Sequence, residues 1–177
     1  MSDQPIAVLL IEDDDADARL FQAMLAQEAD PAFAVEHVRT LRDGLERLAR
    51  GRIEGVLLDL SLPDSKELNT FEQLHRYVAT TPIVILTGID DKALALDAMR
   101  KGAQDYLVKG HIDGGLLSRV IRHAIERKHS EAMLKRERDQ LQQLNKLLMG
   151  REERVLELKR EVDELRQELG RDKKYSA

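Results

Sequence analysis

Five side chains in this sequence are of the types that carry out phosphoryl transfer, and each stands at or just after the end of a short apolar run. Glu12 and Asp13 follow the first run, Asp59 and Thr87 end two others, and Lys109 follows a fourth. Crowded carboxylates repel one another unless a hard cation neutralises them, and Mg²⁺ prefers oxygen ligands. Asp59 can then attack phosphorus as a nucleophile, while Lys109 and Thr87 donate to the phosphoryl oxygens.

The elements that must position these side chains alternate regularly along the chain. Apolar runs of β type predict strands at 6–11, 34–38, 56–59, 83–87 and 106–108. Helical periodicity predicts helices at 18–26, 41–49, 70–77 and 92–101. Alternation of this kind predicts an α/β fold with a doubly wound, five-stranded parallel sheet. Ligands bind such sheets outside the carboxyl ends of the strands, where all five side chains are expected.

Helix-capping residues support this arrangement. Thr40 and Asp43 are spaced as a capping box for the second helix, and Asp90 or Asp91 can cap the fourth. Asp14 or Asp15 can likewise cap the first helix, whose N-terminus favours negative charge. Capping alone is therefore an alternative explanation for part of the acidic cluster.

Composition narrows the class of protein. The chain has 177 residues, of which 42% are hydrophobic and 34% charged, so we expect one globular domain with an extension. Cysteine is absent, which excludes disulfides and thiolate metal sites. The N-terminus has no leader pattern and no apolar run reaches membrane-spanning length, so a cytoplasmic protein without a membrane partner is expected. A net charge of -5 gives no general case for nucleic acid.

Four segments, taken together, resemble the receiver domain of two-component response regulators. They are Glu12-Asp13, LLDLSLP at 57–63, ILTG at 85–88 and GAQDYLVK at 102–109. Each is weak alone, but they occur in the right order at the ends of successive predicted strands. The resemblance covers about residues 5–127 and implies a flavodoxin-like fold, with a receiver domain at 1–127.

The resemblance also implies a role for each site residue. Asp59 would accept a phosphoryl group from the phosphohistidine of a histidine kinase. Asp13, Asp59 and the Ser61 backbone carbonyl would bind Mg²⁺, with Glu12 acting through a metal-bound water.

Three further roles concern the phosphorylated state. Lys109 would pair with the phosphate and Thr87 would move to hydrogen-bond it, while Tyr106 would turn inward as the aromatic switch. Such a device is a two-state equilibrium biased by a local charge. Two departures from the family pattern affect loop shape: Gly110 stands where many members carry proline, and 63–68 lacks a glycine often found there.

Other functions of the same residues remain as alternatives. Phosphatases of the haloacid-dehalogenase type need a second Asp two positions after the nucleophile, and Ser61 stands there, so we expect no enzymatic turnover. A flavin site is disfavoured because the carboxylates at 12–14 would repel phosphate. A dimeric pseudo-receiver scaffold that is not phosphorylated, or a phosphate sink in a phosphorelay, are the remaining possibilities.

The C-terminal part of the chain has a heptad pattern. Leucine or valine recurs at the a positions 134, 141, 148, 155, 162 and 169, and leucine at the d positions 144, 158 and 165. Glu137 and Arg151 are charged exceptions at d. Helical spacing also runs without interruption from Leu117. We therefore predict a fifth helix that continues into a coiled coil at 128–170, followed by a polar tail at 171–177. A helical hairpin folding back near Gly150 is the alternative to a homodimer.

The same region carries no clear DNA-reading or catalytic signal. Basic residues between 122 and 138 precede the heptads, but acidic residues between 126 and 139 interrupt them, so no nucleic-acid partner is expected. His123 and His129 lie in no recognisable phosphotransfer motif. Signalling is therefore expected through protein contacts of the coiled-coil dimer, with a partner coiled coil or effector protein and without a DNA-binding or enzymatic output domain.

Overall fold

The computed structural model describes residues 4–28, 32–78, 80–88, 91–172 and 174–175. The chain divides into two compact units, Met1–Ser130 and Glu131–Ala177. No helix in the described part of the chain is long and apolar enough to cross a membrane.

A five-stranded, wholly parallel sheet forms the centre of the first unit, with strand order β2-β1-β3-β6-β7. Its strands are β1 (Ile6–Ile11), β2 (Phe33–Val38), β3 (Gly55–Asp59), β6 (Ile83–Thr87) and β7 (Asp105–Val108). The predicted α/β, flavodoxin-like fold is confirmed. Three strands begin one residue earlier than their apolar runs, at Phe33, Gly55 and Asp105.

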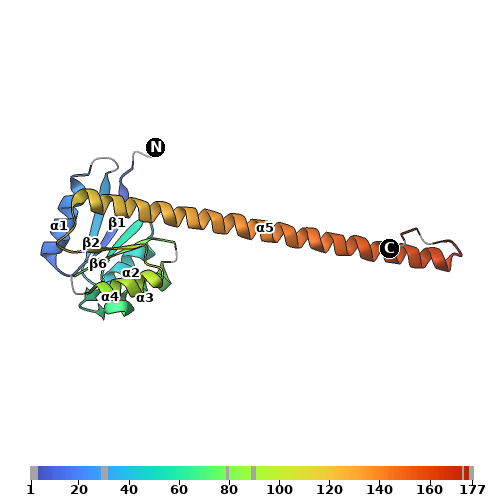
Figure 1. Ribbon diagram of the computed structural model, residues 1–177, viewed down its shortest axis with the longest axis horizontal. Helices are drawn as coiled ribbons and strands as arrows, with labels where there is room; N and C mark the ends of the chain where they lie inside the picture. Colours follow the sequence, from blue (N-terminus) through green and yellow to red (C-terminus); the bar gives the residue numbers. More distant parts are fainter. Residues whose placement is uncertain (1–3, 29–31, 79, 89–90, 173, 176–177) are drawn as a thin grey trace. The chain divides into compact units, whose positions relative to one another are not determined.

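Helices cover both faces of the sheet, as Figure 1 shows. They are α1 (Asp15–Ala26), α2 (Leu41–Ala49), α3 (Glu67–Tyr77), α4 (Lys92–Arg100) and α5 (Gly114–Glu168). Side chains of α2, α3 and α4 pack on one face, and side chains of α1 and the first turns of α5 pack on the other. The predicted helices are present, although α1 and α3 each begin three residues earlier than predicted.

The core splits into two layers because successive strand residues point to opposite faces. Leu9, Ile11 and Leu58 belong to the layer under α2–α4, whereas Leu10 and Leu57 belong to the layer under α1 and α5. All five side chains are fully buried. Burial on both faces explains why the strands read as continuous apolar runs.

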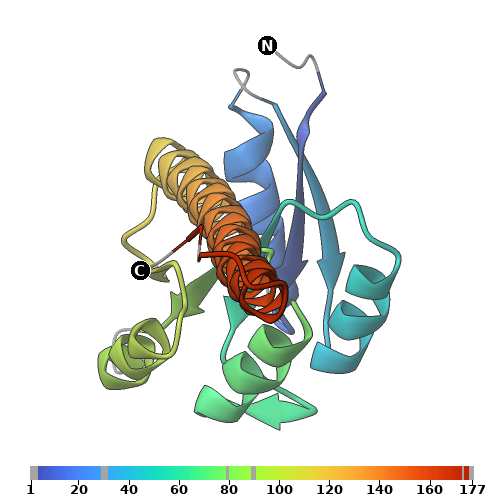
Figure 2. The same cartoon turned by 90° about the vertical axis from the view of Figure 1, so that its right-hand side faces the viewer.

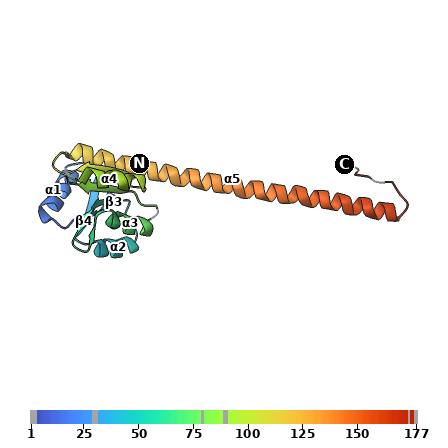
Figure 3. The same ribbon diagram turned by 60° about the horizontal axis from the view of Figure 1, so that its bottom comes forward.

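A small antiparallel hairpin that the sequence patterns did not indicate follows β3. It pairs β4 (Ser61–Leu62) with β5 (Ser65–Lys66) and packs on α3, as Figure 3 shows for β4. Each strand has only two residues, too few for a periodicity to appear. Glu67 leaves the hairpin with a φ of 57°, a left-handed conformation that L-residues rarely adopt.

The hairpin is fixed to the helices on both sides. In its turn, Asp64 accepts hydrogen bonds from the backbone N–H groups of Leu41 (2.9 Å) and Arg42 (3.0 Å), at the start of α2. The buried Thr70 hydroxyl in α3 lies 3.0 Å from the Ser65 hydroxyl and donates to the Leu60 carbonyl at 3.1 Å. The segment after Asp59 is thus held between two helices.

The predicted caps are present in part. The Thr40 hydroxyl accepts from the Asp43 N–H at 3.0 Å, and the Asp14 carboxylate accepts from the N–H groups of Ala16 and Asp17. Asp91 occupies the N-cap position of α4 without a side-chain capping hydrogen bond. Asp90, the other candidate, lies outside the described residues.

The second unit contains the later turns of α5 and the tail. The helix passes through Gly150 without interruption, so the hairpin alternative is wrong. Its heptad leucines and valines are exposed, from 39% for Val162 to 71% for Leu169. Beyond the helix the tail turns back against it, where the Asp163 carboxylate accepts from the backbone N–H groups of Lys174 and Tyr175 (Figure 2).

Candidate functional site

The sheet brings four of the sequence-predicted site residues to its carboxyl edge. Register pairs Ile11 with Leu58 and Thr87 with Val108, so Glu12, Asp59, Thr87 and Lys109 lie at the ends of neighbouring strands. The Lys109 N–H also donates to the Thr87 carbonyl at 2.8 Å, extending the ladder between the last two strands by one residue.

The Lys109 ammonium is the centre of the site. Its Nζ lies 2.5 Å from Asp59 Oδ2 and 2.7 Å from Glu12 Oε2, carboxylates from two other strand ends. Glu12 is fully buried and Asp59 is 9% exposed, so these ion pairs form in partial shelter from water. Charges in such surroundings interact more strongly than at an open surface.

Asp17 is a third carboxylate on the same lysine, and sequence reasoning missed it. Its Oδ2 lies 3.0 Å from Lys109 Nζ. Asp17 follows Asp14 and Asp15 in the first turn of α1, where negative charge is common for reasons of helix stability alone. Only the packing of α1 on the sheet brings the Asp17 carboxylate to Lys109, and no local sequence pattern indicates this contact.

The carboxylates form a cluster that could hold a cation. Glu12, Asp13 and Asp59 each offer an oxygen within 4.8 Å of the others. Glu12 Oε2 is buried and, among the described residues, accepts no hydrogen bond of good alignment despite its ionic contact with Lys109. A buried acceptor left without an aligned donor, beside two further oxygen ligands, suits a hard divalent cation.

Burial and charge act on the acid–base properties of the cluster. Burial raises the pKa of Glu12 to about 7, and the negative charge of Asp59 adds to this, while Lys109 opposes it. Burial lowers the pKa of Lys109, but the hydrogen bond to Asp59, the ionic contact with Glu12 and the negative charge of Asp59 outweigh it and raise that pKa overall. The lysine therefore stays charged.

The orientation of the Asp59 carboxylate is set by a donor to each oxygen. Oδ1 accepts from the Ser61 backbone N–H at 2.9 Å, and Oδ2 accepts from Lys109 at 2.5 Å. Because Ser61 begins the hairpin that Asp64 and Thr70 hold, the first of these donors is fixed by contacts with α2 and α3. The carboxylate is thus presented at the sheet edge in one orientation.

Thr87 and Tyr106 lie on the same face of the sheet. Tyr106 pairs with Ile85, which is two residues before Thr87 on β6, and the half-buried Tyr106 ring packs against the layer under α2–α4. The buried Thr87 hydroxyl donates to the Gly88 carbonyl at 3.2 Å. Both residues thus lie on one face of the sheet, and the Thr87 hydroxyl is hydrogen-bonded within its own loop.

Two backbone features complete the edge. A ring nitrogen of His37 lies 2.8 Å from the Glu12 carbonyl oxygen, which fixes the chain where it leaves β1. Gly110 has a φ of 85°, which proline cannot adopt. The loop after Lys109 therefore has a shape that a proline at position 110 would not allow.

An acidic cluster and a lysine at the carboxyl edge of a five-stranded parallel sheet define the class of this protein as a flavodoxin-like receiver. Residues 8–121 match the family described as "Response regulator receiver domain". The chain belongs to this family.

Individual relatives agree with that assignment. The chain is 33% identical over 126 residues to the transcriptional regulatory protein BasR of Escherichia coli (strain K12), covering 70% of this chain and 53% of BasR. It is 32% identical over 134 residues to the cell cycle transcriptional regulator CtrA of Caulobacter vibrioides (strain NA1000 / CB15N), covering 72% of this chain and 54% of CtrA. The chain thus spans about half the length of these relatives.

A solved structure gives the same result for the fold. The response regulator receiver domain protein from Clostridium thermocellum is similar with a TM-score of 0.61 and 26% sequence identity. The similarity covers 70% of this chain and 96% of that one. The matched region therefore corresponds to almost the whole of an isolated receiver domain.

Proposed function

We propose that the protein is a phosphoacceptor, in which Asp59 takes a phosphoryl group from the phosphohistidine of a histidine kinase. The observation that carries this is the contact of Lys109 Nζ with Asp59 Oδ2 at 2.5 Å, within the acidic cluster. A nucleophilic carboxylate beside a permanent positive charge is what transfer of a phosphoryl group requires.

In this proposal the acidic cluster holds Mg²⁺. Asp13, Asp59 and the Ser61 backbone carbonyl would bind the ion, and Glu12 would act through its bound water. When bound, Mg²⁺ neutralises charge on the phosphoryl oxygens and on the carboxylates. The oxygen-only donor set and the buried Glu12 Oε2 support this choice of ion.

The residues of this chain then have distinct tasks in the transfer. An Asp59 oxygen attacks phosphorus, an O–P bond forms and the P–N bond breaks, and its electron pair stays on the imidazole, which takes a proton from solvent. Lys109, already charged and beside Asp59, pairs with the transferred phosphoryl group. Thr87 turns its hydroxyl from Gly88 towards a phosphoryl oxygen, and Tyr106 follows inward on the same face of the sheet.

Turnover as a phosphatase is not part of this proposal. Ser61 stands two residues after Asp59, where a phosphatase of the haloacid-dehalogenase type needs a carboxylic acid. The aspartyl phosphate then decays only slowly by hydrolysis, and the protein acts as a signalling switch.

The proposed output is a homodimer formed by the coiled coil at 128–170, after a receiver at 1–127 and before the tail at 171–177. Eight apolar a and d side chains are exposed on α5 and a ninth, Leu169, directly after it, and burying each contributes about 1.5–3 kcal/mol. Phosphorylation would change association or helix packing, or the binding of a partner coiled coil or effector protein.

Intact-mass spectrometry tests the central step. The full chain is incubated with acetyl phosphate and Mg²⁺, beside an EDTA control, the variant Asp59→Asn and the matched control Asp97→Asn. Asp97 is a half-exposed carboxylate of α4 which, among the described residues, pairs only with Arg100, at 3.1 Å.

One metal-dependent phosphoryl adduct is expected in the wild type and in Asp97→Asn, and none in Asp59→Asn. Absence of the adduct from a folded wild type, with rapid hydrolysis excluded, would favour the dimeric scaffold. An adduct that changes neither association nor hydrogen exchange in α5 would favour the phosphate sink.

A further inference from the structure

The exposed stripe formed by the apolar a and d side chains of the second unit is interrupted by two charged residues. Glu137 and Arg151 occupy d positions, and among the described residues neither forms an ion pair, nor does Glu152. By contrast, Arg154 nearby contacts Glu157 at 2.5 Å. Glu137 and Arg151 thus have no ion pair among the described residues, as is also the case for exposed charges outside the predicted seam, such as Arg160 and Glu164.

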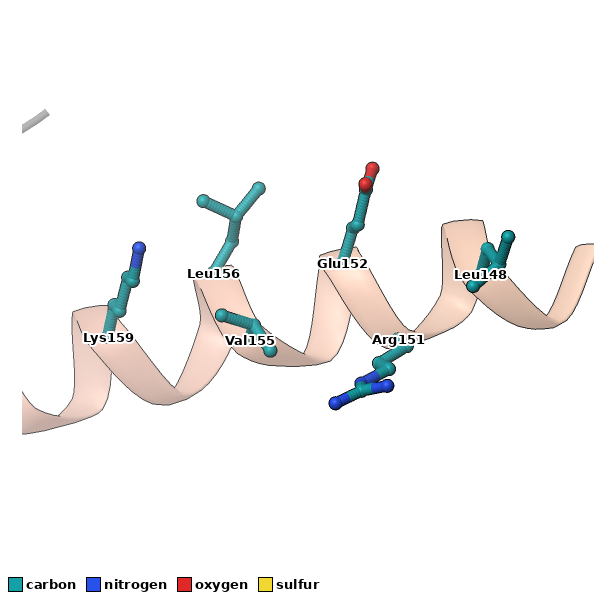
Figure 4. Close-up of a pocket in the computed structure, with 6 residues that line it drawn as sticks. All are labelled: Leu148, Arg151, Glu152, Val155, Leu156 and Lys159. Atoms are coloured by element: carbon teal, nitrogen blue, oxygen red, sulfur yellow. The ribbon is translucent and has the colours of Figure 1, made fainter. Parts of the chain in front are cut away.

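Each charged d residue is followed directly by a residue of opposite charge at e. Glu137 precedes Arg138, and Arg151 precedes Glu152. Figure 4 shows Arg151 and Glu152 pointing to opposite sides of the helix, which prevents them from pairing within one chain. Leu148 and Val155 flank Arg151 along the stripe in the same view.

In a parallel, in-register dimer this order becomes complementary. A d side chain inserts into a hole on the facing helix, and the e residue that follows the facing d position is part of that hole. Glu137 then meets Arg138 of the second copy, and Arg151 meets Glu152 of the second copy. Each layer holds two like charges at its centre and two opposite charges beside them, so its net charge is zero.

Shifted registers lose this complementarity. A shift of one heptad brings Arg151 beside Lys159 in one direction or Asn145 in the other. A shift of two heptads brings it beside Arg166 or Arg138. Among these five arrangements, only the unshifted one pairs Arg151 with an acidic e residue. Like-charge contacts are a means of rejecting wrong pairings.

We propose that the occupant of this stripe is a second copy of the chain, parallel and in register, and that the Glu137–Arg138 and Arg151–Glu152 layers select the register. This inference rests on the coiled-coil dimer of the proposed function and adds its orientation and its specificity determinants. The inference does not depend on phosphorylation of Asp59, so the dimer inference and the phosphoacceptor proposal can fail separately.

Cross-linking tests the orientation, and the absence of cysteine makes it direct. The full-length variant Leu158→Cys, with its single thiol at d, is oxidised at a concentration where the wild type is a dimer by sedimentation. A disulfide-linked dimer is expected, because d faces d in a parallel, in-register pair. A non-covalent dimer that does not cross-link would show another orientation or register and overturn the proposal, as would a wild type that is monomeric at all concentrations.

Charge reversal tests the register layer. Arg151→Glu is expected to raise the dimer dissociation constant about tenfold, since two ion pairs become repulsive contacts. The double variant Arg151→Glu/Glu152→Arg restores the pairing with the charges exchanged, and its dissociation constant should return to within about threefold of wild type. Arg160→Glu, at the outward f position, is the matched control and should leave dimerisation unchanged.

Failure of the double variant to recover would refute the ion-pair layer even if Leu158→Cys cross-links. The acetyl phosphate assay, run on the same variants, reports separately on Asp59. A phosphorylated chain that never dimerises would overturn the inference and the dimeric output together, and it would leave the phosphoacceptor proposal standing.

Discussion

Replacing Asp64 with alanine should release the first turn of α2, although the two lie more than twenty positions apart in sequence. The Asp64 carboxylate accepts from the N–H groups of Leu41 at 2.9 Å and Arg42 at 3.0 Å. The Thr40 hydroxyl accepts from the Asp43 N–H, the third of the helix, so Asp64 supplies the acceptors for the first two. Helices leave such groups unsatisfied unless a cap or water reaches them.

The size of the effect follows from the two hydrogen bonds and the charge that the substitution removes. Loss of a capping side chain costs about 1 kcal/mol, and loss of a negative charge at a helix N-terminus costs about 0.5 kcal/mol more. Water replaces the carboxylate poorly at Leu41, which is only 3% exposed. We therefore expect a loss of about 1.5 kcal/mol, equivalent to about tenfold faster opening of this turn. Asp64→Asn keeps one acceptor oxygen and should lose about half as much.

Hydrogen exchange of the full chain, followed by mass spectrometry, measures this directly. Peptides covering 41–49 should exchange about tenfold faster in Asp64→Ala at its first-turn amides, while those of α4 remain unchanged. Asp91→Ala is the matched control, because Asp91 is at an N-cap position but makes no capping hydrogen bond. Equal effects of the two substitutions on their respective helices would refute the reasoning, as would wild-type exchange in α2 of Asp64→Ala.

Three further predictions concern the site and its surroundings. The pKa of Glu12 is raised to about 7, and only the ionised carboxylate binds cations. The affinity for Mg²⁺, measured by titration calorimetry, should therefore increase as the pH rises through about 7. Glu12→Gln should remove this pH dependence. Glu67→Gly should stabilise the protein to urea by about 0.5–1 kcal/mol, because its φ of 57° is strained for glutamate, whereas Glu46→Gly within α2 should destabilise it. Burial lowers the pKa of His75 from 6.5. The contribution of His75 to stability is therefore complete above pH 6.5 and is lost as the pH falls through the lower pKa of the folded state. Urea unfolding of His75→Gln should show a weaker loss of stability over that pH range.

The parts of the fold that the sequence predicted are those governed by local patterns. The runs at 6–11 and 83–87 have the predicted bounds as strands, because residues buried on both faces of a sheet must be apolar throughout. The helix at 41–49 was also predicted with its correct bounds, because Thr40 marks its start. The roles of Asp59, Thr87, Lys109 and Tyr106 remain proposals. Strand order places the first three at one edge of the sheet, and strand register places Thr87 and Tyr106 on one face.

Contacts between distant segments were not predicted. Asp17 and Asp64 are ordinary acidic residues by sequence, one in a helix's first turn and one in a turn after proline. Their partners, Lys109 and the N-terminus of α2, lie far along the chain, and no periodicity relates them. Likewise, the two-residue strands of the hairpin are shorter than any pattern can resolve.

By itself the sequence determined the alternation of strands and helices, the chemical types at the strand ends and the heptad stripe, because each depends on near neighbours in the chain. Only the tertiary structure decided which carboxylates meet Lys109, which oxygen of Asp59 faces it and how the segment after Asp59 is held. Those outcomes depend on how separate helices and loops pack over the sheet edge, where a difference of a few ångströms separates an ion pair from two solvated charges.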